Sequence, residues 1–244
     1  MQKVGLVVPC YNEADRLRSD DFVDFLTTHP QYQVLFVNDG SSDATHRVIN
    51  KLATENPNVY ALDLPANQGK AEAVRSGMLY TIEHWDLDIV GFLDADLATP
   101  LEEILHFERL MNQHHQYHLV LGSRWKRLGS KIERSTARHY LGRIFATVVS
   151  LVFNLSVYDT QCGAKLMRSQ HLAQVFKEPF ISPWFFDIEI LCRYRQLFSG
   201  KPVDDWAAEI PLYVWHEVGG SRIKAFDFIT APLALLKIRR SYPS

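Results

Sequence analysis

Short apolar runs alternate with helical patterns through the first half of the chain. The runs cover residues 4–8, 34–37, 59–64, 89–93 and 119–121. Each run has the length of a strand, and the segments between the runs are long enough for helices of several turns. Because this alternation is typical of a mostly parallel sheet with helices on its faces, the pattern predicts an α/β fold with a flanked central sheet.

Polar side chains follow three of these predicted strands at the point where each strand ends. Asp39 follows the second run, Lys70 the third, and the pair Asp94 and Asp96 the fourth. The carboxyl ends of parallel strands share one edge of a sheet, and open α/β sheets bind their ligands there. We therefore expect one crevice, suited to a ligand with a base or ribose, a pyrophosphate and a metal ion. Taken singly, Asp39 is also a common turn residue, and Lys70 also fits a solvated surface.

Asp94 and Asp96 are two carboxylates spaced i, i+2 at the abrupt end of an apolar run. If the strand continues through them, both side chains point to the same side, and if the chain turns, both still lie at the edge of the sheet. Two close carboxylates raise each other's pKa unless a cation lies between them, so the pair predicts a site for Mg²⁺ or Mn²⁺. The alternative is an acidic turn before a helix, with Thr99 as N-cap and Pro100 at the first helical position.

The composition favours one domain over residues 1–244, since 47% of the residues are apolar. A net charge of −2 argues against a nucleic-acid binder. Three cysteines without a C-x-x-C spacing indicate reduced thiols, which favours a cytoplasmic protein. The first residues have no signal-peptide layout, and no stretch reaches the roughly 18 apolar residues of a membrane span. We expect a soluble protein or one peripheral on the cytoplasmic face of a membrane.

Five motifs occur in a fixed order along the chain. They are VPCYNE at 8–13, VNDGSSDAT at 37–45, NQGK at 67–70, DAD at 94–96 and GSR at 122–124. In this order they resemble the successive signatures of family-2 glycosyltransferases with the GT-A fold. Within that family the chain is similar to the dolichyl-phosphate (polyprenyl-phosphate) mannosyl- and glucosyltransferases. The resemblance covers nearly the whole chain and implies a Rossmann-like nucleotide-sugar-binding half over about residues 1–122 and an acceptor half over about 123–244.

The resemblance also implies roles for individual residues. It implies Pro9, Tyr11, Glu13 and Asp39 for the nucleoside, Lys70, Ser221 and Arg222 for the diphosphate, Asp94 and Asp96 for the cation, Arg124 and Arg138 for the acceptor phosphate, and Asp187 for the donor sugar. Residues 159–168 correspond to a short loop over the sugar site. For Asp187 the alternative is a structural role, since an acidic residue stabilises the first turn of a helix. One departure is Ala98, which stands where related mannosyltransferases often have a polar third metal ligand. Metal ligation is then expected to rest on two carboxylates, phosphate oxygens and water.

An apolar stretch at residues 140–153 follows a locally basic tract. The stretch is too short to span a bilayer, and it fits either a core helix or an interfacial helix with arginines near lipid headgroups. The resemblance favours the interfacial helix. Peripheral membrane contact through about residues 137–155 is therefore expected.

Taken together, these features predict an inverting glycosyltransferase. The hypothesis is transfer of a hexose, with glucose favoured, from a nucleotide diphosphate sugar, with UDP favoured over GDP, to a polyprenyl phosphate. Such a phosphate is mostly a dianion at pH 7, so it needs positioning more than deprotonation. Two alternatives stay open. One is a soluble transferase acting on a saccharide hydroxyl with Asp187 as general base, and the other is a non-catalytic nucleotide-sugar-binding module.

Overall fold

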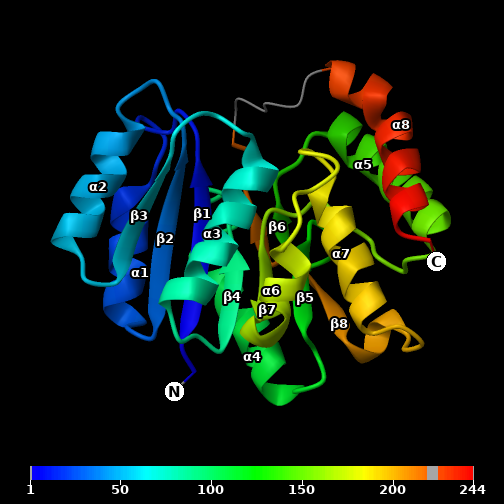
Figure 1. Ribbon diagram of the computed structural model, residues 1–244. Coiled ribbons are helices and arrows are strands. Elements are labelled where there is room, and N and C mark those ends of the chain that lie inside the picture. The colour runs from blue at the N-terminus through cyan, green and yellow to red at the C-terminus, as the bar shows by residue number, and fades with distance from the viewer. Residues whose placement is uncertain (1, 219–224, 244) are drawn as a thin grey trace.

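A seven-stranded sheet runs through the centre of the molecule (Figure 1). The computed structural model describes residues 2–218 and 225–243. In spatial order the strands are β3 (Val59–Leu64), β2 (Tyr32–Asp39), β1 (Val4–Cys10), β4 (Ile89–Phe92), β7 (Lys165–Arg168), β5 (Leu119–Ser123) and β8 (Ala207–Pro211). The five apolar runs of the first half are β1 to β5, so those strand predictions are confirmed.

The sheet is mostly parallel, as predicted, with one reversed strand inside it. β1 pairs in parallel with β2 and β4, β2 pairs in parallel with β3, and β5 pairs in parallel with β8. β7 runs antiparallel to both β4 and β5 and separates them. The expectation that residues 159–168 form only a loop is wrong for its last part, because β7 is buried between two strands. Both predicted halves of the chain therefore contribute strands to the same sheet.

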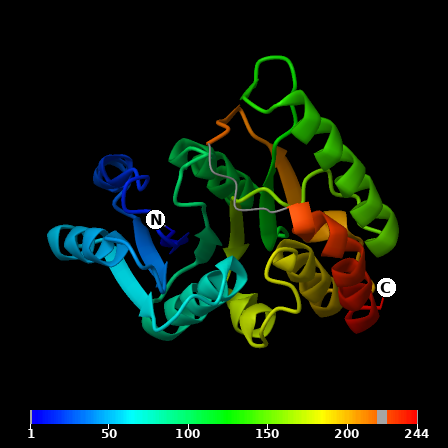
Figure 2. The same cartoon turned by 90° about the horizontal axis from the view of Figure 1, so that it is seen from above.

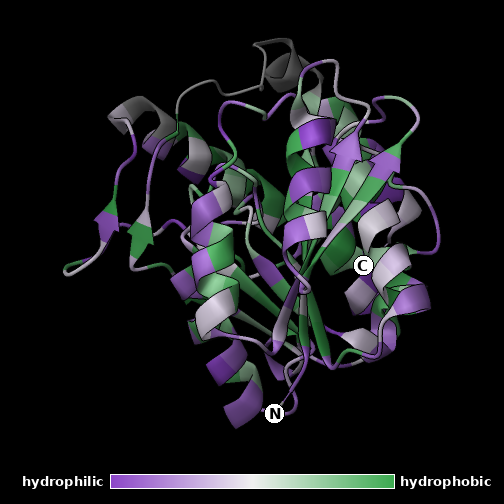
Figure 3. Cartoon of the chain, turned by 90° about the vertical axis from the view of Figure 1, so that its left-hand side faces the viewer, coloured by the Kyte–Doolittle hydropathy of each residue, from purple (hydrophilic) through white to green (hydrophobic). Residues whose placement is uncertain are grey.

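Helices cover both faces of the sheet and define two hydrophobic cores. The first core includes residues of α3 (Lys70–His84), α6 (Leu172–Phe176) and α7 (Phe186–Leu197). The second includes residues of α1 (Ser19–Thr28), α2 (Thr45–Glu55) and α4 (Leu101–Gln113). Val7 belongs to the first core and its neighbours Leu6 and Val8 to the second, as the alternation of side chains along a strand requires. Hydrophobic residues accordingly line the central strands in Figure 3.

The second half of the chain adds a pair of helices beyond the sheet. Helices α5 (Thr136–Phe153) and α8 (Ala225–Ser241) lie side by side (Figures 1 and 2). Two short strands, β6 (Lys131–Ile132) and β9 (Val214–Trp215), form a parallel pair of their own. Within the described residues, no helix combines the length and the apolar character that crossing a membrane requires.

Candidate active site

A cavity of about 1050 Å³ lies where β1, β2 and β4 end. Among its lining residues are Pro9, Tyr11, Glu13, Asp39, Lys70, Asp94, Asp96, Arg124 and Asp187. Arg138 lies in the first turn of α5, but its side chain falls outside the described part of the structure, as do Ser221 and Arg222 entirely. The structure therefore brings the described candidate residues together in one cavity. For Asp39, Lys70 and the acidic pair, the shared edge of parallel strands predicts this arrangement.

The loops that follow β1, β2 and β3 are tied to one another by hydrogen bonds. The amide N of Glu13 donates to Thr45 Oγ1 at 2.8 Å, which joins the first loop to the start of α2. Asp39 accepts from the amide N of Gln68 at 2.7 Å and of Gly69 at 2.8 Å. Asp39 is 2% exposed, so it holds the loop before α3 in addition to lining the cavity. Its role is more than that of a simple turn residue.

Lys70 is held at the start of α3 by an ion pair with Asp94. Its Nζ lies 2.5 Å from Asp94 Oδ1, and its side chain is 34% exposed. Burial alone would lower the pKa of Lys70, but the carboxylates of Asp94 and Asp187 outweigh that effect and raise it. Lys70 is therefore a fixed cation inside the cavity, and the alternative of a solvated surface lysine is wrong.

Asp94 and Asp96 lie on a turn, because β4 already ends at Phe92. Within this turn the amide N of Ala98 donates to Asp96 Oδ1 at 3.1 Å, and Arg16 Nη2 donates to Asp96 Oδ2 at 3.4 Å. The helix that follows begins at Leu101 with Pro100 as N-cap, so Thr99 and Pro100 each sit one position earlier than the acidic-turn alternative expects. The carboxylates still face the cavity, which that alternative alone does not explain.

The two carboxylates suit a hard divalent cation. Burial raises the pKa of Asp96, and the charge of Asp94 raises it further, so a cation near both would stabilise their ionised forms. Among the described residues, no group of three or more His, Cys, Asp or Glu side chains could hold a metal ion. The two carboxylates supply only part of the oxygen ligands that such a cation takes, and Ala98 adds no side-chain oxygen.

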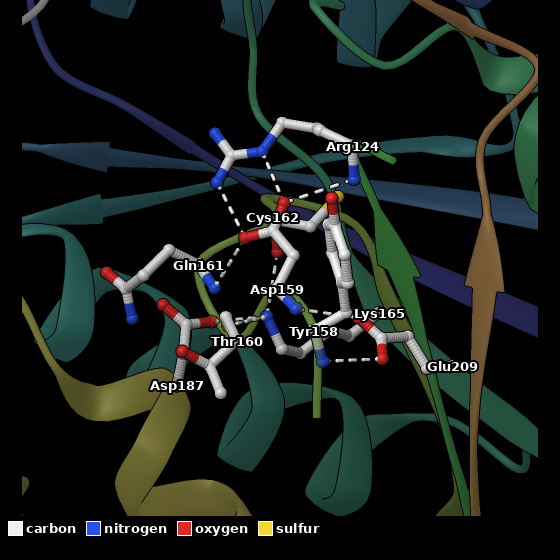
Figure 4. Close-up of polar contacts among 9 residues, drawn as sticks. All are labelled: Arg124, Tyr158, Asp159, Thr160, Gln161, Cys162, Lys165, Asp187 and Glu209. Atoms are coloured by element: carbon white, nitrogen blue, oxygen red, sulfur yellow. Dashed lines mark hydrogen bonds and ion pairs between the residues drawn. The ribbon is translucent and has the colours of Figure 1, made fainter. Parts of the chain in front are cut away.

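Arg124 forms a two-point ion pair with Asp159 (Figure 4), and both residues line the cavity. Its Nε and Nη2 donate to the two carboxylate oxygens at 2.6 and 2.8 Å. Burial would raise the pKa of Asp159, but the Arg124 guanidinium holds it down to about 2. Glu209 on β8 accepts from the amide N atoms of Tyr158 and Asp159 at 2.8 and 2.7 Å. The Arg124 guanidinium is thus fixed within the lining of the cavity by Asp159.

Asp187 is paired with a lysine that has no exposed surface (Figure 4). Lys165 Nζ donates to Asp187 Oδ1 at 2.5 Å, to the carbonyl oxygen of Cys162 at 2.7 Å and to that of Thr160 at 3.1 Å. Asp187 lies in the first turn of α7, and this ion pair accounts for it better than helix capping alone. Burial raises the pKa of the Cys162 thiol to about 11, which disfavours that thiol as a nucleophile.

The family model for "Glycosyl transferase family 2" matches residues 6–180 of the chain. The chain belongs to this family. The match covers β1 to β5, β7 and most of the lining of the cavity, so the family resemblance inferred from the order of the motifs is confirmed.

This family-2 glycosyltransferase is also similar to individual proteins. It is 32% identical to dolichyl-phosphate beta-glucosyltransferase ALG5A of Trichomonas vaginalis, over 96% of the chain and 72% of that protein. It is 29% identical to the Homo sapiens dolichyl-phosphate beta-glucosyltransferase, over 99% of the chain and 76% of that protein. Glucosyl-3-phosphoglycerate synthase from Mycobacterium tuberculosis, solved with Mn²⁺, uridine diphosphate and glucosyl-3-phosphoglycerate, superposes with a TM-score of 0.67 at 18% identity, over 100% of this chain and 81% of that one. The structural likeness confirms the predicted GT-A fold.

Three charged residues of this family-2 glycosyltransferase have roles that sequence reasoning missed. Arg16 reaches Asp96, Asp159 fixes Arg124, and Lys165 fixes Asp187. The one signal for Lys165 is a lysine flanked by apolar residues, which is unusual in a solvated loop. Arg16 carries no such signal, because its partner is 80 residues away in the chain.

Proposed function

We propose that this chain transfers glucose from UDP-glucose to a polyprenyl phosphate such as dolichyl phosphate, with inversion at the anomeric carbon. The observation that carries the proposal is one cavity whose lining contains two kinds of charged group. The acidic pair and Lys70 suit a nucleotide diphosphate with a cation, and the arginines suit a second phosphate. These arginines are Arg124, Arg134 and Arg143. The names of the relatives support glucose and dolichyl phosphate, and the ligands of the solved structures support UDP.

In the proposed reaction, an oxygen of the acceptor phosphate forms a bond to the anomeric carbon as the bond from that carbon to UDP breaks. The dianionic acceptor carries no proton that must be removed, and it becomes a phosphodiester. Arg124 and Arg138 would orient the acceptor, while Lys70 would meet the negative charge that develops on the leaving diphosphate. Asp94 and Asp96 would hold Mg²⁺ or Mn²⁺, which when bound neutralises charge on the diphosphate.

The proposal includes contact with the cytoplasmic face of a membrane through α5 and α8. The outward side of α5 carries large apolar residues, including Ile144, which is 63% exposed, and Leu151, which is 79% exposed. Leu233 and Leu236 are exposed on the neighbouring α8, and Lys237 and Arg240 on α8 are exposed cations. An apolar surface bordered by basic residues is typical of proteins that lie on anionic bilayers. Since Leu141 and Arg143 of α5 also line the cavity, a lipid phosphate would enter from this side.

A donor screen tests the proposal. The purified chain is incubated with UDP-glucose, UDP-galactose or GDP-mannose, with Mn²⁺ or EDTA, and with a short-chain polyprenyl phosphate, and the product is analysed by mass spectrometry. The expected product is the lipid phosphate plus one hexose, formed from UDP-glucose and lost with EDTA. A product formed only on a saccharide hydroxyl would support the soluble-transferase alternative, and donor binding without turnover or hydrolysis would support a non-catalytic module.

The soluble-transferase alternative requires Asp187 as general base for a hydroxyl. Its Oδ1 already accepts a hydrogen bond from the buried Lys165 at 2.5 Å, so this oxygen is occupied by a donor of the protein. This pairing favours the phosphate acceptor, which needs no base.

A further inference from the structure

The Lys165 ammonium group joins two separate segments that face the cavity. Lys165 is the first residue of β7, is paired with Phe92 of β4 and has no exposed surface. Two of its acceptors are the carbonyl oxygens of Thr160 and Cys162, and the third is the carboxylate of Asp187 on α7. A buried ammonium group is costly unless it is fully bonded, so these three contacts fix the relative positions of both segments.

The segment 158–163 is also held at further points, and it contacts one residue of the proposed donor site. Asp159 pairs with Arg124, and Glu209 accepts two of the segment's amide N–H groups. A Cβ added at Gly163 would lie 2.0 Å from Asp94 Oδ2, so the segment passes in direct contact with the acidic pair. Lys165 is thus the link between the wall that touches Asp94 and the carboxylate of Asp187.

We propose that Lys165 is a positioning residue for the donor sugar, acting through Asp187; this rests on the proposed function. Lys165 holds Oδ1 of Asp187, and this orients the second carboxylate oxygen for a hydrogen bond to a hydroxyl of the glucosyl group. The residues that follow β1 and β2 would hold the UDP part of the donor, and none of them is among the groups to which Lys165 Nζ donates. Loss of Lys165 should therefore weaken binding of UDP-glucose and leave binding of UDP nearly unchanged.

A double-mutant cycle tests this role. Dissociation constants for UDP and for UDP-glucose are measured by calorimetry in Mn²⁺ for the wild type, Lys165→Met, Asp187→Asn and the double variant. Each single variant should bind UDP-glucose about tenfold more weakly, the range of one charge-assisted hydrogen bond, and UDP within about twofold of the wild type. The double variant should be no weaker than either single variant, because both act on one contact.

The controls separate positioning from folding. Arg193 forms a buried ion pair with Glu189 outside the cavity, so Arg193→Met should lower the melting temperature without changing the ratio of the two dissociation constants. If Lys165→Met does not fold, the test compares the dissociation constants of Asp187→Asn with those of the double variant. The double variant lacks both buried charges. These two variants should bind UDP-glucose equally and more weakly than the wild type.

Three results would overturn the role of Lys165. They are equal weakening of UDP and UDP-glucose in Lys165→Met, additive effects in the double variant, and wild-type affinity for UDP-glucose in Asp187→Asn. A wild type that binds neither UDP nor UDP-glucose would instead count against the proposed function itself.

Discussion

Gly163 lies so close to Asp94 that no side chain fits between them, since a Cβ on Gly163 would stand 2.0 Å from Asp94 Oδ2. Gly163→Ala should therefore displace the Asp94 carboxylate, which also carries the ion pair with Lys70. We expect the transfer rate to fall by about a hundredfold, the scale of losing one group that stabilises developing charge. Steady-state rates with UDP-glucose and a polyprenyl phosphate measure the effect.

Gly200→Ala is the matched control for this prediction. Gly200 has a φ of +85° with open space around its Cβ position, and it lies outside the cavity. This variant should lose about 1 kcal/mol of stability because of the left-handed backbone, and it should keep its activity. A Gly163→Ala variant with wild-type rates would contradict the position of Asp94 described above.

Asp96 should matter more than Asp187 if the acceptor is a phosphate. Asp96→Asn removes a carboxylate next to the proposed cation and should reduce the turnover number by about a hundredfold or more. Asp187→Asn removes a contact to the donor sugar and should cost about tenfold. Turnover numbers of the two variants with polyprenyl phosphate provide the comparison. The reverse order would indicate a hydroxyl acceptor with Asp187 as general base.

The Arg124 and Asp159 ion pair should make stability depend on pH in the acid range. The pKa of Asp159 is about 2 in the folded protein against an ordinary value of 3.8. Its contribution is therefore fully present above about pH 4 and is lost as the pH falls toward 2, and it amounts to roughly 2 kcal/mol. Asp159→Asn should lower the melting temperature at pH 7, and its difference from the wild type should shrink as the pH falls through this window.

Melting curves from pH 7 to pH 2 measure this difference. Asp86→Asn is the control, because the Asp86 side chain is fully exposed and should leave the pH profile unchanged. A difference between wild type and Asp159→Asn that stays constant down to pH 2 would argue against a depressed pKa.

The outward side of α5 should control access to a membrane-bound acceptor. Ile144→Glu and Leu151→Glu together place two carboxylates on the proposed membrane surface, which opposes insertion and repels anionic lipid. We expect at least a tenfold loss of binding to vesicles that contain anionic lipid. Turnover of a long-chain polyprenyl phosphate in those vesicles should fall in parallel, while turnover of a short, water-soluble acceptor should not.

Ile82→Glu is the matched control for the vesicle experiment, since Ile82 is an exposed apolar residue on α3 rather than on α5 or α8. It should bind vesicles as the wild type does. Equal binding by the α5 variant and the control would exclude α5 from the membrane contact.

The sequence predicted the first five strands and the gathering of Asp39, Lys70, Asp94 and Asp96, because these depend on local patterns. A buried parallel strand has a short run of apolar residues as its sequence pattern, and the polar residues that follow the run show where the strand ends. The antiparallel β7 was missed because it is four residues long and begins with a lysine, which reads as a loop. The one sequence signal that this lysine is buried is that apolar residues flank it.

The order of motifs along the chain by itself determined the family, the fold class and the edge of the sheet where the site lies. Only the tertiary structure decided how the charges are paired: Arg16 with Asp96, Lys70 with Asp94, Arg124 with Asp159, and Lys165 with Asp187. The reason is physical. Strands and turns follow from interactions between near neighbours in the sequence, whereas an ion pair depends on which distant segments the packed sheet brings within a few ångströms of each other.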